Sequence, residues 1–107
     1  KSLTISDRKR LEVARALATR PRLLLLDEVM AGLNPTELGQ MLDILKRIRG
    51  RGVTLLVIEH IMAAIMTVSE RLLVLHHGEK IADGAPKAVA GDQRVVDAYL
   101  GEEYLLA

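Results

Sequence analysis

Several residue types are absent or scarce in this chain of 107 residues, and each absence excludes a class of structure or function. There is no cysteine, which rules out disulfide bonds and thiolate metal sites. Phenylalanine and tryptophan are also absent and there are only two tyrosines, so we do not expect a nucleic-acid surface built on base stacking. No apolar run approaches the length of a membrane-spanning helix.

The apolar half of the chain is aliphatic instead, with many leucine, valine, isoleucine and alanine residues. This content and the length of 107 residues are sufficient for one small domain with a core. The chain starts at Lys1 rather than at a methionine, so we expect it to be a fragment or a trimmed product of a longer protein.

Charge is unevenly distributed, although the net charge is only +1. Residues 1–22 carry seven basic side chains against Asp7 and Glu12, which makes this segment +5 and leaves −4 on the rest of the chain. Such a basic end indicates either an anionic partner or a solvated helix face, and the sequence leaves both open.

The most informative stretch is a run of four leucines, residues 23–26, that leads directly into Asp27 and Glu28. An uninterrupted apolar run of this length is typical of a strand buried on both faces of a parallel sheet. The two carboxylates then fall at the carboxyl end of the strand, where open α/β sheets bind their ligands. One carboxylate could hold Mg²⁺ on a nucleotide and the other could orient or deprotonate a water molecule. The alternative is a strand that simply meets a loop.

A helix is predicted before this strand. Thr4 followed three residues later by Asp7 fits a capping pattern, although Ser6 could cap as well, and Pro21 ends the helix. The first turn carries basic residues 8–10, where the helix dipole would favour acidic ones. Basic side chains beside free backbone N–H groups at a helix N-terminus suit an anion such as phosphate.

Alternating helices and strands are predicted for the rest of the chain. Asn34 and Pro35 form a strong helix start, and this helix runs to Gly50. A second buried strand, residues 53–58, ends in Glu59 and His60, at the same sheet edge as the first pair of acids if the strands are parallel. The remaining predictions are a helix over 61–69, a strand over 71–75 with a hairpin partner over 80–84, and short helices over 86–90 and 92–100. This order predicts an α/β layered fold with a parallel sheet.

The arrangement as a whole resembles the C-terminal half of the ATP-binding subunit of an ABC transporter, over nearly the entire chain. His60 resembles the switch histidine, residues 23–28 the Walker B strand and residues 31–34 the D-loop. The family's LSGGQ signature corresponds to residues 3–7. The Ala-Gly-Leu-Asn-Pro form of the D-loop and the ending over residues 78–84 and 95–103 are similar to branched-chain amino-acid (Liv-type) transporters.

This resemblance implies a fold and a set of roles. The fold would be a partial P-loop NTPase (ABC ATPase) fold, with residues 1–107 forming the C-terminal part of one nucleotide-binding domain: parallel strands, flanking helices and a C-terminal hairpin. Asp27 would hold Mg²⁺ through water, Glu28 would be the general base, and His60 would contact the γ-phosphate. Asn34 would cross the interface of a dimer of two such subunits. The signature positions would face the ATP of the second subunit, and they are Thr4, Ile5, Ser6 and Asp7.

The chain also departs from the family pattern. Ile5 and Ser6 replace signature glycines, Asp7 replaces the glutamine, and Val29 replaces the usual proline after Walker B. No GxxxxGK(S/T) phosphate loop occurs in the 107 residues, and no Q-loop precedes the signature. Without that loop the β- and γ-phosphates have no backbone nest. We therefore expect this chain alone neither to bind ATP tightly nor to hydrolyse it.

The function implied by the resemblance is that of a fragment of an ABC importer ATPase, with branched-chain amino acids as the expected cargo. The implied partners are a second nucleotide-binding subunit and transmembrane permease subunits, at the cytoplasmic face of the membrane, with no nucleic acid. Apolar surface left uncovered predicts that the isolated chain oligomerises. The alternative is a non-catalytic α/β module that binds a partner nucleotide-binding subunit.

Overall fold

The structure, a computed structural model, describes residues 2–100. The chain divides into two compact units, Lys1–Ala64 and Ile65–Ala107, and helix α3 (Met62–Val68) crosses the boundary between them. Among the described residues, none of the helices is both long and apolar enough to cross a membrane.

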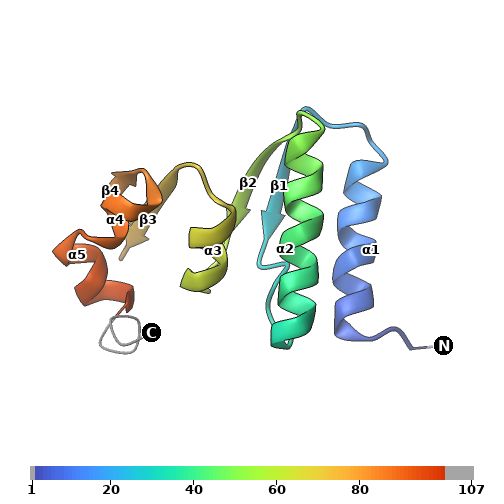
Figure 1. Ribbon diagram of the computed structural model, residues 1–107, viewed down its shortest axis with the longest axis horizontal. Coiled ribbons are helices and arrows are strands. Elements are labelled where there is room, and N and C mark those ends of the chain that lie inside the picture. Colours follow the sequence, from blue (N-terminus) through green and yellow to red (C-terminus); the bar gives the residue numbers. More distant parts are fainter. Residues whose placement is uncertain (1, 101–107) are drawn as a thin grey trace. The chain divides into compact units, whose positions relative to one another are not determined.

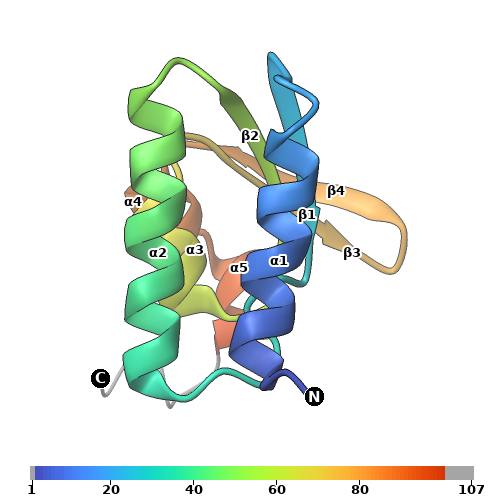
Figure 2. The same ribbon diagram turned by 90° about the vertical axis from the view of Figure 1, so that its right-hand side faces the viewer.

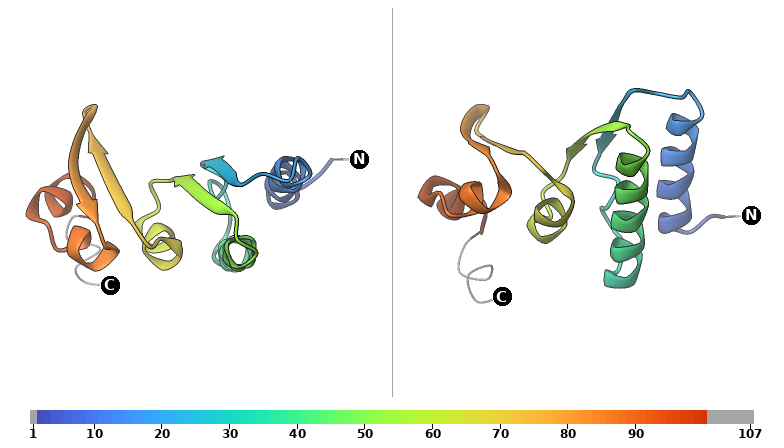
Figure 3. Two further views of the ribbon diagram at one scale, coloured as in Figure 1. Left: turned by 90° about the horizontal axis from the view of Figure 1, so that it is seen from above. Right: turned by 45° about the horizontal axis from the view of Figure 1, so that its top comes forward.

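The first unit contains two helices and two strands in alternation. They are α1 (Ile5–Leu17), β1 (Leu23–Asp27), α2 (Pro35–Gly50) and β2 (Thr54–Ile58). Figures 1 and 2 show α1 and α2 side by side, and in the view from above in Figure 3 both helices are seen end-on. Strands β1 and β2 pair in parallel, so that β1, α2 and β2 form a βαβ unit, as the alternating pattern predicts.

Both long helices begin at the predicted caps. The Thr4 hydroxyl accepts a hydrogen bond from the Asp7 N–H at 3.0 Å. At the start of α2 the Asn34 side chain accepts from the Glu37 N–H at 2.8 Å, and the Glu37 carboxylate accepts from the Asn34 N–H at 3.0 Å. This reciprocal capping box, with Pro35 at the first helical position, fixes where α2 starts.

The core of the first unit lies between α2 and one face of the strands. Helix α2 buries Met41, Leu45 and Ile48, and β1 buries Leu24 and Leu26. The other face is uncovered: Leu23, Leu25, Leu56 and Ile58 are each more than half exposed. The prediction that β1 is buried on both faces is therefore wrong for this chain, because no described element packs on the second face. The prediction that β2 is a buried strand is wrong for the same reason, since each of its residues is exposed or half-buried.

The second unit is built on a hairpin. Strands β3 (Leu72–His76) and β4 (Glu79–Gly84) pair antiparallel, with a register irregularity after Val74. The two-residue turn has positive φ at both His77 (49°) and Gly78 (77°), the backbone conformation that two-residue hairpin loops favour. In the part of the chain that is described, β3 pairs only with β4, so the parallel sheet consists of β1 and β2.

Short helices follow the hairpin, in three segments: α4 (Pro86–Ala90), α5 (Gln93–Val95) and the π-helical turn η1 (Val96–Leu100). The Tyr99 hydroxyl donates a hydrogen bond to the Leu75 carbonyl, which ties η1 to β3. The resulting core is aliphatic and includes Leu72, Val74, Val89 and Val95.

Candidate functional site

The polar residues that follow β1 and β2 meet at the carboxyl ends of the two strands, as expected from the sequence. The Glu28 N–H donates to the Ile58 carbonyl at 2.9 Å, which extends the parallel ladder one residue beyond β1. His60 Nδ1 lies 3.4 Å from Glu28 Oε1, and both side chains are more than half exposed. An imidazole and a carboxylate at this separation, open to solvent, can contact the same water molecule.

Glu28 adopts a backbone conformation that is unfavourable for a residue with a side chain. Its φ is 53°, in the left-handed region. That region costs about 1–2 kcal/mol for a non-glycine residue, so surrounding contacts must hold it there. Strained positions of this kind are concentrated at functional sites, which agrees with Glu28 as a site residue.

Asp27 is the last residue of β1 and lies opposite Ile58 in the register. Its side chain is exposed. Among the described residues no three histidine, cysteine or acidic side chains are close enough to hold a metal ion by themselves. Mg²⁺ that keeps its water ligands and binds phosphate needs only one or two carboxylates, so Asp27 fits magnesium carried by a nucleotide.

Glu59 lies at the end of β2, as the sequence predicts, but the sequence pattern did not indicate a role for it. Its Oε2 accepts a hydrogen bond from the Met30 N–H at 3.0 Å, across from β2 to the loop after β1. Its Oε1 is buried and has no hydrogen-bond partner among the described residues. In the sequence, the only indication of a role for Glu59 is that it is an acidic residue beside His60 at the end of an apolar strand.

The first turn of α1 packs against the D-loop-like segment. Gly32 has a φ of 79°, and a Cβ atom there would lie 3.5 Å from Cγ2 of Ile5. Ile5 is half exposed, whereas Ser6 is 6% exposed and so presents little surface to a ligand. Figure 1 shows the N-terminal ends of α1 and α2 at the same end of the unit, the end toward which β1 and β2 point.

The remaining signature-like and loop positions are engaged in helix capping. The Asp7 N–H is already bonded to Thr4, and the Asn34 amide caps α2. The Arg10 guanidinium donates to the side chain of Gln40 on α2, so this member of the basic first turn is held by a neighbouring helix. The predicted site residues thus fall into two groups at one end of the unit. One is the strand-end group of Asp27, Glu28 and His60, and the other is formed by the capped helix starts.

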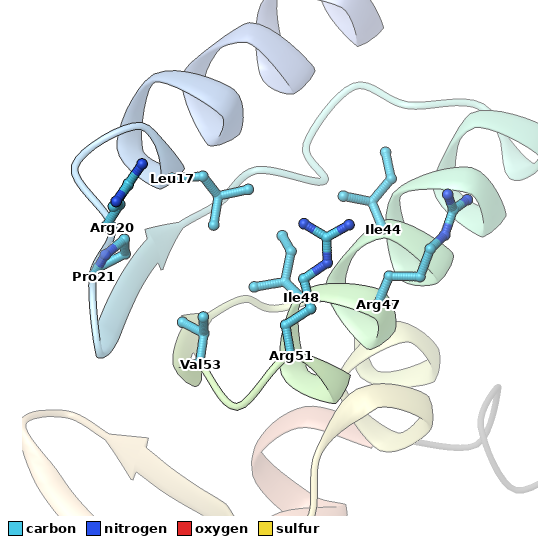
Figure 4. Close-up of a pocket in the computed structure, with 8 residues that line it drawn as sticks. All are labelled: Leu17, Arg20, Pro21, Ile44, Arg47, Ile48, Arg51 and Val53. Carbon is cyan, nitrogen blue, oxygen red and sulfur yellow. The ribbon is translucent and has the colours of Figure 1, made fainter.

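A cavity of about 460 Å³ lies at the opposite end of the strands, between the C-terminal ends of α1 and α2 and the residue before β2. Figure 4 shows apolar side chains such as Leu17, Ile44 and Ile48 and the guanidinium of Arg51 pointing between them. Arg20 and Arg47 complete its basic lining. Because it adjoins the strand starts, this cavity is separate from the strand-end residues.

Comparison with known proteins agrees with the geometry. Residues 79–104 match the family model of the branched-chain amino acid ATP-binding cassette transporter. Over 102 residues, 94% of this chain, the sequence is 41% identical to the high-affinity branched-chain amino acid transport ATP-binding protein BraF of Pseudomonas aeruginosa. It is 37% identical over 105 residues to the lipopolysaccharide export system ATP-binding protein LptB of Haemophilus influenzae, covering 98% of this chain and 44% of that protein.

The fold matches as well. The crystal structure of a nucleotide-free ATP-binding cassette from an ABC transporter superposes with a TM-score of 0.84 at 30% identity, over 94% of this chain and 42% of that chain. In sequence and in fold, the chain is similar over most of its length to part of the ATP-binding subunits of ABC transporters, those for branched-chain amino acids included. Its fold is a partial ABC ATPase fold, as predicted.

The chain spans about 40% of the length of the curated branched-chain amino-acid relatives it matches. Two features of the structure agree with this partial span. The parallel sheet has only two strands among the described residues, and one of its faces is bare.

Proposed function

We propose that this chain is the hydrolytic, C-terminal part of the ATP-hydrolysing subunit of an ABC importer for branched-chain amino acids. The observation that carries the proposal is the 3.4 Å approach of His60 Nδ1 to Glu28 Oε1 where two parallel strands end. It combines a carboxylate base and an imidazole on one solvent-open edge, beside the exposed carboxylate of Asp27.

The chemistry assigned to these residues is the activation of water against a terminal phosphate. Glu28 accepts the proton of the attacking water, and the hydrogen bond from its N–H to the Ile58 carbonyl holds it at the strand end. His60 donates a hydrogen bond to a γ-phosphate oxygen and is released when that phosphate leaves. Asp27 would hold nucleotide-bound Mg²⁺ through a water ligand, and the ion would supply neutralisation of phosphate charge.

The second group of residues belongs to the proposed contact with another subunit. Of the four signature-like positions, Thr4, Ile5 and Asp7 would face the ATP bound to that subunit, whereas Ser6 is buried at 6% exposure. Asn34 would cross the interface. Support comes from their common placement at the N-terminal ends of α1 and α2. Ile5 is bulkier than the glycine that the family has at this position, and Asp7 is negatively charged where the family has glutamine. We therefore expect this segment to bind phosphate weakly.

The cargo assignment rests on the C-terminal segment. Residues 79–104 match a family model described by branched-chain amino acids, and BraF is more similar to the chain than LptB is. The complete subunit would bind ATP and Mg²⁺, dimerise, and attach to permease subunits as a peripheral protein on the cytoplasmic face of the membrane. The 107 residues alone, which carry no phosphate-loop motif, are expected to be inactive.

The test uses the subunit that carries these residues together with a phosphate loop. Glu28→Gln should lower kcat for ATP hydrolysis by about 10²–10⁴, the usual contribution of a general base, while ATP binding measured by fluorescence titration is retained. His60→Ala should also lower kcat, and Glu79→Gln at the exposed hairpin serves as the control. Full turnover in Glu28→Gln would contradict the assignment.

The alternative is a non-catalytic α/β module that binds a partner nucleotide-binding subunit. Reading the gene upstream of Lys1 separates the two. An in-frame phosphate-loop sequence supports the ATPase, whereas a start codon close to Lys1 favours the module.

A further inference from the structure

Three consecutive residues at the end of β2 all contact the segment that follows β1, each in a different way. The Ile58 carbonyl accepts from the Glu28 N–H at 2.9 Å, and His60 Nδ1 lies 3.4 Å from the Glu28 carboxylate. Between them, Glu59 Oε2 accepts from the Met30 N–H at 3.0 Å. Of the three, only Glu59 reaches past Glu28 into the loop that leads to Asn34.

We propose that Glu59 is a positioning residue for the hydrolytic site. It fixes the loop after Glu28 to the strand end that carries His60, so the γ-phosphate sensor and the D-loop-like segment move as one body. The inference rests on the proposed function, because it assigns Glu59 a part in that same site.

The loop needs this tie because its own hydrogen bonds are weak. The Ala31 N–H lies 3.4 Å from the Glu28 carbonyl, and the Leu33 N–H lies 3.4 Å from the Met30 carbonyl. Both distances lie beyond the usual range for N–H···O bonds. The bond from the Met30 N–H to Glu59 Oε2, at 3.0 Å, is shorter than either of these and lies within the usual range.

The burial of the contact strengthens the tie further. Met30 is fully buried and Val29 is 4% exposed, so the residue after Glu28 and the donor itself are both anchored in the core. Glu59 itself is half-buried, so this hydrogen bond is screened by water less than one on the surface would be. It therefore opposes relaxation of the left-handed backbone at Glu28, whose φ is 53°.

The other oxygen of Glu59 argues against a role in stability alone. Glu59 Oε1 is buried without a hydrogen-bond partner among the described residues, which is unfavourable for a carboxylate. Only one oxygen is used to hold Met30, so a neutral amide at this position would retain the acceptor. This gives a conservative variant, Glu59→Gln, that separates the Met30 contact from the charge.

The contact is tested directly by amide hydrogen exchange on the 107-residue chain, read at Met30. Glu59→Ala should raise the exchange rate of the Met30 amide about tenfold or more, while the Glu28 amide, held by the Ile58 carbonyl, changes little. Glu59→Gln should retain most of the Met30 protection, and Glu79→Ala should leave it unchanged. Unaltered protection of Met30 in Glu59→Ala would overturn the inference.

The consequence for hydrolysis is tested in the phosphate-loop-containing subunit. Glu59→Ala should lower kcat about tenfold to a hundredfold with KM for ATP nearly unchanged, and Glu59→Gln should restore much of the loss. A purely structural defect would lower the folded fraction and leave the kcat of the folded enzyme intact, which also overturns the inference. If the unmodified subunit does not hydrolyse ATP, the proposed function fails, while the Met30 exchange still decides whether Glu59 holds the loop.

Discussion

Ile5, the first residue of α1, packs directly over Gly32 in the loop between β1 and α2. A Cβ atom at Gly32 would lie 3.5 Å from Cγ2 and 3.7 Å from Cδ1 of Ile5. The signature-like position is therefore in contact with the chain's own D-loop-like segment. The side chain that Ile5 carries in place of the family's glycine therefore joins the start of α1 to this loop. These are the two segments that are proposed to face a second subunit.

Gly32→Ala is expected to destabilise the chain by about 1–2 kcal/mol. The φ of 79° is strained for any residue with a Cβ, and the added methyl group meets Ile5 at ordinary contact distance, so backbone conformation dominates. Gly39→Ala is the matched control: Gly39 lies within α2 with nothing within 4 Å, and alanine should stabilise it by about 0.5–1 kcal/mol. Urea unfolding monitored by circular dichroism measures both free energies. Equal effects of the two variants would contradict the assigned strain.

Asn34→Ala is expected to destabilise the chain by about 1 kcal/mol, because it removes the acceptor for the Glu37 N–H. Asn34→Asp keeps an acceptor oxygen and places a negative charge at the helix N-terminus, so its free energy of unfolding should equal or exceed that of the unmodified chain. The same unfolding titration provides the values. A fully stable Asn34→Ala variant would show that Pro35 alone determines the start of α2.

The sequence was sufficient to predict every helix and strand of the described residues to within a few positions. Local signals explain this success: the Thr4 and Asn34 caps, and the leucine run that ends in Asp27. The approach of His60 to Glu28 also followed, because parallel neighbouring strands end at one edge.

Contacts that depend on side-chain placement could not be predicted in the same way. The Glu59 bond to Met30 joins residues 29 positions apart, and nothing in the local pattern marks it. Uncovered apolar surface was expected, but its place on one face of β1 was not, since an apolar run is the same whether or not a second layer covers it. The family resemblance supplied the roles of Asp27, Glu28 and His60, which their spacing alone did not fix.

The hairpin of the second unit should lose stability in acid. Arg71 Nε and Nη2 each donate to the Asp83 carboxylate at 2.8 Å, and this hydrogen bonding, with a smaller Coulombic attraction, lowers the pKa of Asp83 below its ordinary value of 3.8. A carboxyl group whose pKa is lowered by folding stabilises the fold above its unfolded pKa, and that stability is lost as the pH falls through the folded pKa.

This pH dependence is checked by comparing thermal unfolding of the unmodified chain and Asp83→Asn between pH 7 and pH 2. The unmodified chain should be the more stable at neutral pH, and the difference should shrink as the pH falls below 3.8 and disappear once the carboxyl group of Asp83 is protonated in the folded chain. Because both groups are solvent-exposed in part, added salt should also reduce the difference. A difference that does not shrink at all as the pH falls would assign the effect to the amide itself.

The apolar sheet face, formed by Leu23, Leu25, Leu56 and Ile58, should drive self-association of the isolated chain. Their exposed fractions of 53–62% leave a contiguous aliphatic surface on two paired strands, and such surfaces are rarely left open to water. Leu25→Lys should shift the chain towards monomer in light scattering with little loss of stability, because Leu25 is 62% exposed already. Leu26→Lys, which places the same charge one residue further along β1 at a position only 4% exposed, should unfold the chain instead. A monodisperse monomer for the unmodified chain would show that this face does not associate.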